Sequence, residues 1–105
     1  MTKYVRIDYT IKPDVDLGEV KAAIGEFVAS IASHHPDHRY TSYQSATDPR
    51  RFVHIAELVE DAVADFQTRP FFLKFSEFLH EHCATGPDVT LLTRVASARV
   101  GQREC

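Results

Sequence analysis

The segment FFLKFSEFLHEHC, residues 71–83, concentrates residues that could do chemistry: four Phe, two His and one Cys within little more than three helical turns. A metal site there would use His80, His82 and Cys83, because imidazole and thiolate groups are zinc ligands. Side chains two positions apart lie about 200° apart around a helix, so His80 and His82 cannot hold one ion. His80 and Cys83 alone fall short of the four ligands of a structural zinc site. We therefore expect no metal here.

The same segment forms an apolar stripe if it is helical. Phe71, Phe75 and Phe78 share one helix face with His82, while Lys74 lies on the opposite side. Two interpretations of His82 stay open. In one it is a histidine at a helix end, hydrogen-bonded to a carbonyl group or reaching solvent. In the other it is a catalytic base on the wall of a pocket.

His54 is the second candidate, because an ionisable ring is unusual in the middle of the strand-like segment RFVHIAELV, residues 51–59. It is either a core or dimer-interface histidine with satisfied hydrogen bonds, or an acid/base group that faces a ligand. Periodicity does not decide which face of the strand points toward the helices, so the side of His54 stays open.

Tyrosines and a histidine-rich segment complete the candidates. Tyr9, Tyr40 and Tyr43 could hydrogen-bond an oxygenated aromatic ligand, although tyrosines are also common on strands for packing alone. The segment HHPDH, residues 34–38, is expected to be an exposed loop between a helix and a strand, because Pro36 disfavours helical geometry at the residue before it.

The composition is that of an ordinary globular protein. The 105 residues predict a single domain over 1–105, with a core at about 3–96 and a tail at 97–105. A net charge of -3 without a Lys/Arg cluster argues against nucleic-acid binding. No apolar run approaches membrane-spanning length, so we expect a cytoplasmic protein with no membrane partner. Cys83 and Cys105 are expected to be free thiols. No phosphate-binding loop or paired-carboxylate motif occurs, so no cofactor is expected.

Periodicity predicts the order strand, helix, strand, strand, helix, strand. The predicted strands are residues 3–11, 39–46, 51–59 and 88–96, and the predicted helices run from an Asp16 cap to about His34, over about 61–67 and over 69–83. Asp16 and Glu19 resemble a capping box at the start of the first helix. Thr68 is a predicted N-cap for the last helical piece, with Pro70 in its first turn.

This order is the ferredoxin-like α+β arrangement, in which two helices cover one face of a four-stranded antiparallel sheet. Both strand faces carry apolar residues, with Phe52 and Ala56 on one side and Val53 and Ile55 on the other. A sheet with one solvated face would alternate more cleanly. We infer that a second copy of the chain covers the other face, in a homodimer.

Two segments carry a resemblance to a known family: YTSYQSATDPRRFVHIAELVEDA, residues 40–62, and FQTRPFFLKFSEFL, residues 66–79. Together with the element order, they resemble the antibiotic biosynthesis monooxygenase domain, a dimeric α+β barrel. The resemblance spans Tyr4 to about Ala96. It implies a homodimer with facing sheets, and a pocket in each subunit between the sheet and the helices. Characterised relatives include cofactor-free monooxygenases of phenols or quinols, and haem-degrading enzymes.

Phe66 and Phe71 stand where such relatives often carry Trp or His. Haem-degrading relatives depend on a Trp in that region and a His on the following helix, and the matching positions here hold Phe66 and roughly Ser76, which argues against haem degradation. The sequence thus predicts a cofactor-independent monooxygenase acting on a phenolic or quinol-like aromatic. The candidate site residues are His54 and His82 as catalytic bases, and Tyr9, Tyr43, Phe66, Phe71 and Phe75 as ligand contacts. The alternative is a non-catalytic dimeric protein on the same fold, which binds a small hydrophobic molecule or serves as an accessory protein. The Phe residues favour this alternative because they remove polar groups.

Overall fold

A computed structural model describes residues 1–98 of the chain. In chain order the elements are β1 (Thr2–Ile11), α1 (Leu17–His34), β2 (Arg39–Gln44), β3 (Arg51–Val59), a 3-10 turn η1 (Glu60–Ala62), α2 (Val63–Thr68), α3 (Pro70–His82) and β4 (Cys83–Leu92). This order confirms the ferredoxin-like α+β class.

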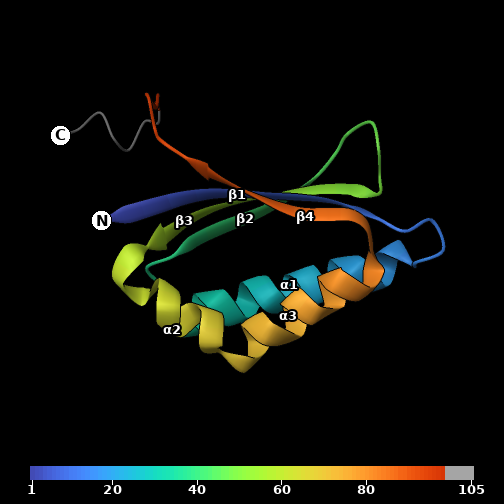
Figure 1. Cartoon of the computed structure of the whole chain (residues 1–105), viewed down its shortest axis with the longest axis horizontal. Coiled ribbons are helices and arrows are strands. Elements are labelled where there is room, and N and C mark those ends of the chain that lie inside the picture. Colours follow the sequence, from blue (N-terminus) through green and yellow to red (C-terminus); the bar gives the residue numbers. More distant parts are fainter. Residues whose placement is uncertain (99–105) are drawn as a thin grey trace.

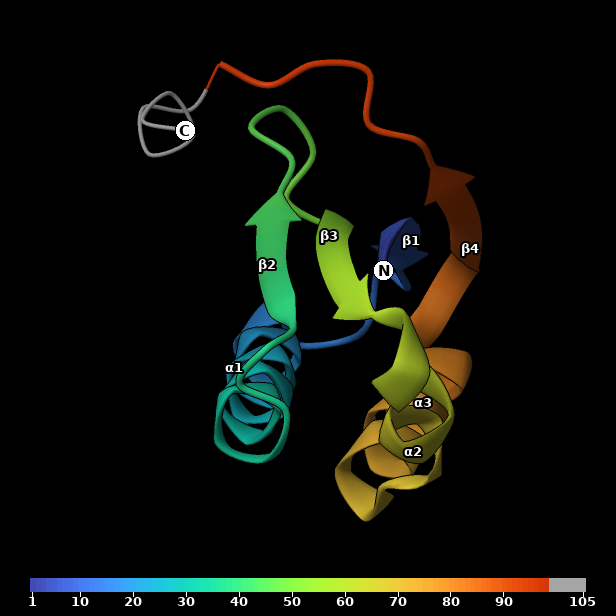
Figure 2. The same ribbon diagram turned by 90° about the vertical axis from the view of Figure 1, so that its left-hand side faces the viewer.

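The sheet is antiparallel throughout, with the strand order β2-β3-β1-β4. All three α-helices lie on one side of it, and the opposite face carries no helix from the described part of the chain (Figure 1). The view along the layers shows α1 under β2, and α2 and α3 on the side of β4 (Figure 2).

The start of α1 follows the capping rule predicted for it, whereas α2 and α3 begin without a side-chain cap bond. Asp16 caps α1 as predicted, since its side chain accepts a hydrogen bond from the Gly18 backbone N–H. The prediction of Thr68 as a cap is wrong: Arg69 occupies that position in α3 and makes no side-chain cap bond. The Thr68 hydroxyl instead donates to the Asp65 carbonyl at 2.7 Å, inside the preceding turn.

The last strand begins earlier than predicted. β4 covers Cys83–Leu92 instead of 88–96, because Cys83 pairs with Ile11 and the strand continues along β1. Gly86 makes this possible: its φ is +82°, and a Cβ there would lie 2.7 Å from the Asp8 carbonyl oxygen. Gly86 therefore lies inside a strand whose register along β1 is shifted.

The core lies between the sheet and the helices. From the sheet it takes Val5, Tyr9, Phe52, Ala56 and Leu58, all buried, and these meet the buried face of α1. The register pairs Ile7 with His54 and Val5 with Ala56, so His54 shares the helix-facing side. This settles the open question of which strand face His54 occupies.

Residues 93–98 form no helix or strand, and the rest of the predicted tail, with Cys105, lies outside the described residues. No helix within residues 1–98 is long and apolar enough to cross a membrane.

Candidate functional site

An apolar pocket of about 210 Å³ lies between the helix-facing side of the sheet and helices α2 and α3. Its polar lining consists of Lys3, Tyr40, Gln67 and Ser76. Its apolar lining consists of Val5, Ile7, Phe27, Ala56, Leu58, Val63, Phe66, Phe72, Phe75, Leu79, Pro87, Val89 and Leu91. Val89 and Leu91 on β4 are each 65% exposed, so the pocket opens at this edge of the sheet.

Behind this pocket, His54 is completely buried and both of its ring nitrogens are hydrogen-bonded. Tyr9 bonds Nε2 at 2.8 Å and Tyr40 bonds Nδ1 at 2.7 Å. A neutral imidazole carries one N–H and one acceptor nitrogen, so one tyrosine hydroxyl donates to the ring and the other accepts from it. The three side chains form a closed network whose outer member, Tyr40, lines the pocket.

Burial keeps this network uncharged. It lowers the pKa of His54 to about 4, because the imidazolium would lose its hydration. Burial likewise raises the pKa of Tyr9 and of Tyr40 above the usual value of a phenol. At neutral pH, His54 is therefore in its unprotonated, proton-accepting form.

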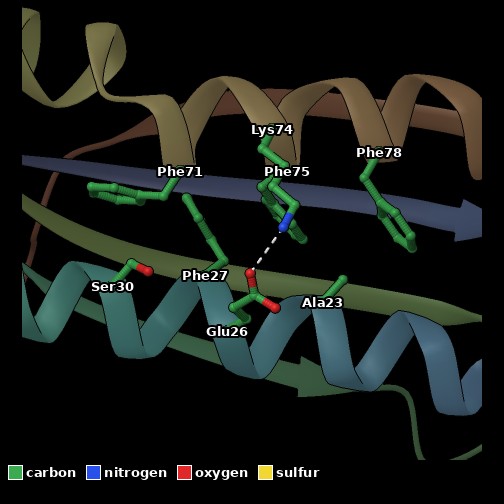
Figure 3. Close-up of a pocket in the computed structure, with 8 residues that line it drawn as sticks. All are labelled: Ala23, Glu26, Phe27, Ser30, Phe71, Lys74, Phe75 and Phe78. Atoms are coloured by element: carbon green, nitrogen blue, oxygen red, sulfur yellow. Dashed lines mark hydrogen bonds and ion pairs between the residues drawn. The ribbon is translucent and has the colours of Figure 1, made fainter.

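Phe75 separates His54 from the open part of the pocket. Its ring stacks on Phe27 with centroids 4.3 Å apart, and it lies parallel to the His54 ring at 5.9 Å. Both Phe rings also border a second, smaller cleft of about 100 Å³ between α1 and α3. Figure 3 shows this cleft, with Phe71 and Phe78 at its sides and the Lys74–Glu26 ion pair, 3.0 Å long, across it.

The structure brings together some of the predicted site residues. Phe66 and Phe75 line the larger pocket, and Tyr9 lies behind it in contact with His54. Phe71 lines the smaller cleft. Tyr43 is 56% exposed, and its pairing with Val53 puts it on the sheet face away from the helices.

His82 lies at the C-terminal end of α3 and borders neither cavity. Its Nδ1 hydrogen-bonds the Phe78 carbonyl at 2.7 Å, and its ring stacks on that of Phe78. The helix-end interpretation predicted such a carbonyl bond.

The expectation that residues 34–38 form an exposed loop is wrong for two of its histidines. His35 and His38 are buried, and their rings stack at 5.1 Å. Asp65 bonds His35, and Phe66 packs edge-on against both rings. The residues that cover the two histidines come from α2, about 30 positions further along the chain. Within the segment itself, the density of histidines was the only sign that it could be more than a loop.

We compared the sequence and the structure with known proteins. No family model matches the sequence, and no curated protein matches it either. Among solved structures, a crystal structure of an antibiotic biosynthesis monooxygenase is 22% identical with a TM-score of 0.76, covering 91% of this chain and 100% of the other. A variant of SnoaB, a cofactor-independent oxygenase from Streptomyces nogalater, is 17% identical with a TM-score of 0.75, covering 91% and 95%.

A conserved protein from Methanosarcina mazei Go1 is 14% identical with a TM-score of 0.76, covering 88% of this chain and 91% of its own. At such identities the likeness concerns the fold, and the activity of a relative does not follow from it. The likenesses confirm the resemblance drawn from the sequence: the chain has the fold of the antibiotic biosynthesis monooxygenase structures.

Proposed function

We propose that the protein is a cofactor-independent monooxygenase of the antibiotic biosynthesis type, acting on a small phenolic or quinol-like aromatic. The observation that carries the proposal is an apolar pocket lined by Tyr40, whose hydroxyl is hydrogen-bonded to the buried, neutral His54. The pocket of about 210 Å³ is below the roughly 300–1,000 Å³ of sites for drug-sized ligands, so a substrate of one or two rings fits it best.

Tyr40 and His54 together supply the base that such a reaction needs. The substrate hydroxyl donates to the Tyr40 oxygen while the Tyr40 proton moves to His54 Nδ1. Tyr9 accepts from Nε2–H and stabilises the imidazolium that forms. The isolated network is a weak base, given a pKa of about 4, and the adjacent phenolate raises the proton affinity of the ring.

The resulting phenolate then reacts with dioxygen. It transfers one electron, and the phenoxyl radical and superoxide combine at a ring C–H carbon to give a peroxide. Loss of water from that peroxide leaves a quinone, so phenol and dioxygen yield quinone and water. The apolar walls, Phe66, Phe72 and Phe75, keep bulk water from the intermediates.

Oxygen uptake tests the proposal. The pure protein is incubated in air with a panel of hydroquinones and polyphenols, and uptake is compared with that of His54→Ala and His82→Ala. We expect uptake above buffer in the wild type and in His82→Ala, and its loss in His54→Ala. Absence of oxygen uptake with every compound would overturn the proposed oxygenase activity.

A second candidate function is binding of a small hydrophobic molecule without turnover. It is favoured by His54 itself, since both ring nitrogens already have protein partners and the ring does not line the pocket. Thermal stabilisation by an aromatic ligand, without oxygen uptake, would support this function over the first.

We further propose that the protein works as a homodimer through the helix-free face of the sheet. This face carries the exposed Tyr43 and the half-buried Val53 and Ile55. It also carries the Arg51–Asp8 ion pair, 3.3 Å long. Light scattering at micromolar concentration should give twice the chain mass, and Ile55→Glu should give a monomer. The matched control is Ala22→Glu on the exposed side of α1, which should stay dimeric. A wild-type monomer would overturn the dimer.

A further inference from the structure

His35 and His38 form a buried pair at the end of α1, outside the network around His54. The two side chains are 9% and 6% exposed, and their rings are nearly parallel, with an interplanar angle of 10°. His35 Nδ1 and His38 Nε2 are buried without a hydrogen-bond partner. Unpaired buried polar atoms lower stability and call for an explanation in a native fold.

The two rings are anchored to two different elements: His35 to α2 through Asp65, and His38 to the last residue of β3, Val59. His35 Nε2 bonds the Asp65 carboxylate at 3.0 Å, and Arg69 holds the same oxygen at 3.0 Å. His38 Nδ1 accepts the Val59 backbone N–H at 3.0 Å. An amide N–H is only a donor, so this last bond requires that Nδ1 of His38 carry no proton.

Helix α2, which carries Asp65, is also one wall of the pocket. Phe66 lines the pocket and meets both histidines edge-on, with centroids 5.4 Å from His35 and 5.1 Å from His38. Val63 and Gln67 of the same helix line the pocket as well. The position of this wall thus depends on contacts made by the two histidine side chains.

We propose that His35, His38 and Asp65 are positioning residues that hold Phe66 against the pocket, and that they do so only while His38 is neutral. This inference rests on the proposed pocket and concerns its regulation, not its chemistry. A proton on His38 Nδ1 removes the acceptor of Val59 N–H and places a cation against the His35 ring. A proton on His35 Nδ1, in contrast, leaves the bond from Nε2 to Asp65 in place.

The charges around the pair support this direction. Burial, and then the neighbouring His35, lower the pKa of His38, while Asp37 in the same loop acts weakly against them. Asp65 faces His35 together with Arg69, and His34 is turned toward Phe71. The arrangement that holds Phe66 against the pocket therefore contains a neutral His38. Acidification below the ordinary pKa of His38 destabilises that arrangement.

Binding of 2-naphthol, measured by calorimetry at pH 7.5 and pH 5.0, tests the inference. We expect the wild-type affinity to fall about tenfold on acidification, because a proton on His38 Nδ1 removes the acceptor of the Val59 N–H. In His38→Asn the amide oxygen can accept the Val59 N–H but cannot be protonated, so the change should be below about twofold. His80→Asn, on the exposed side of α3, is the matched control and should behave as the wild type.

The outcomes separate this inference from the proposed function. A His38→Asn protein that is folded by circular dichroism and keeps the wild-type pH dependence would overturn the positioning role. Amide exchange of Val59 in the wild type is an independent check: protection should fall with the midpoint of the His38 titration, and unchanged protection at pH 5.0 would also overturn it. No binding at pH 7.5 would overturn the pocket and this inference together. pH-dependent binding without oxygen uptake would overturn the proposed oxygenase activity and leave the positioning role standing.

Discussion

The two buried histidine groups differ in how their hydrogen bonds are satisfied. His54, in the middle of the sheet, has a tyrosine on each ring nitrogen. His35 and His38, at the end of α1, each leave one nitrogen unpaired. Hydrogen bonds on both ring nitrogens hold a core histidine in one conformation. A pair with unbonded nitrogens can change conformation when it gains a proton.

The difference also separates two roles at one pocket. The His54 network reaches the pocket through Tyr40, so it can exchange a proton with a bound hydroxyl group. The His35–His38 pair reaches the pocket only through the Phe66 ring, so it can change its shape but not its chemistry. Substitutions in the first group should therefore affect turnover, and those in the second should affect the pH dependence of binding.

The largest effect is expected from His54→Ala. The substitution leaves the Tyr9 and Tyr40 hydroxyls without a partner and opens a cavity, so we expect a loss of about 4 kcal/mol in the free energy of unfolding. Urea denaturation at pH 7.5 measures it. A loss below about 1 kcal/mol would show that the network contributes no more than a surface group does.

Acid should destabilise the protein through the same ring. The pKa of His54 is lowered to about 4 in the folded state, whereas the unfolded chain takes up the proton near pH 6.5. The unfolded state thus binds more protons as the pH falls from about 6.5 to about 4, and stability should decrease by about 3 kcal/mol over that window. Urea titrations along this range should show a shallower decrease for His54→Gln. An equally steep decrease in that variant would assign the effect to other groups.

Tyr9→Phe and Tyr40→Phe distinguish the roles of the two tyrosines that bond His54. Each removes one hydrogen bond to His54, so each should cost about 1 kcal/mol in the free energy of unfolding. Only Tyr40 lines the pocket, so oxygen uptake should fall about 100-fold in Tyr40→Phe and by less than about tenfold in Tyr9→Phe. Equal losses of activity would mean that Tyr40 has no distinct role.

The smallest effect is expected from His82→Ala. His82 is half-buried, bonds the Phe78 carbonyl and stacks on the Phe78 ring, away from both cavities. We expect a change of about 0.5 kcal/mol in the free energy of unfolding and unaltered oxygen uptake. If His82→Ala stayed folded but lost oxygen uptake, His82 would again be a candidate catalytic base.

Much of the fold could be predicted because its signals are local. Asp16 is a side-chain cap, Pro36 follows the end of α1, and the segment that forms β3 has the residue types of a strand. The start of β4 could not, because Cys83 and Gly86 have no strand signal of their own and become a strand only by pairing with β1. Thr68 failed as a cap because its hydroxyl found a carbonyl within the preceding turn.

The candidate site was predictable in part for the same reason. An ionisable residue among Val53, Ile55 and Ala56 singled out His54 from the sequence alone. Its partners did not follow from the sequence, because Tyr9 and Tyr40 lie 45 and 14 positions away and meet it only across the sheet.

The sequence by itself determined the class of the fold, the order of its elements and the unusual position of His54, since periodicity, caps and turns act over a few residues. The tertiary structure alone decided which sheet face His54 occupies, that His35 and His38 are buried, and that His82 stands apart from the pocket. These outcomes depend on strand register and on the packing of α2 and α3, which join residues far apart in the chain.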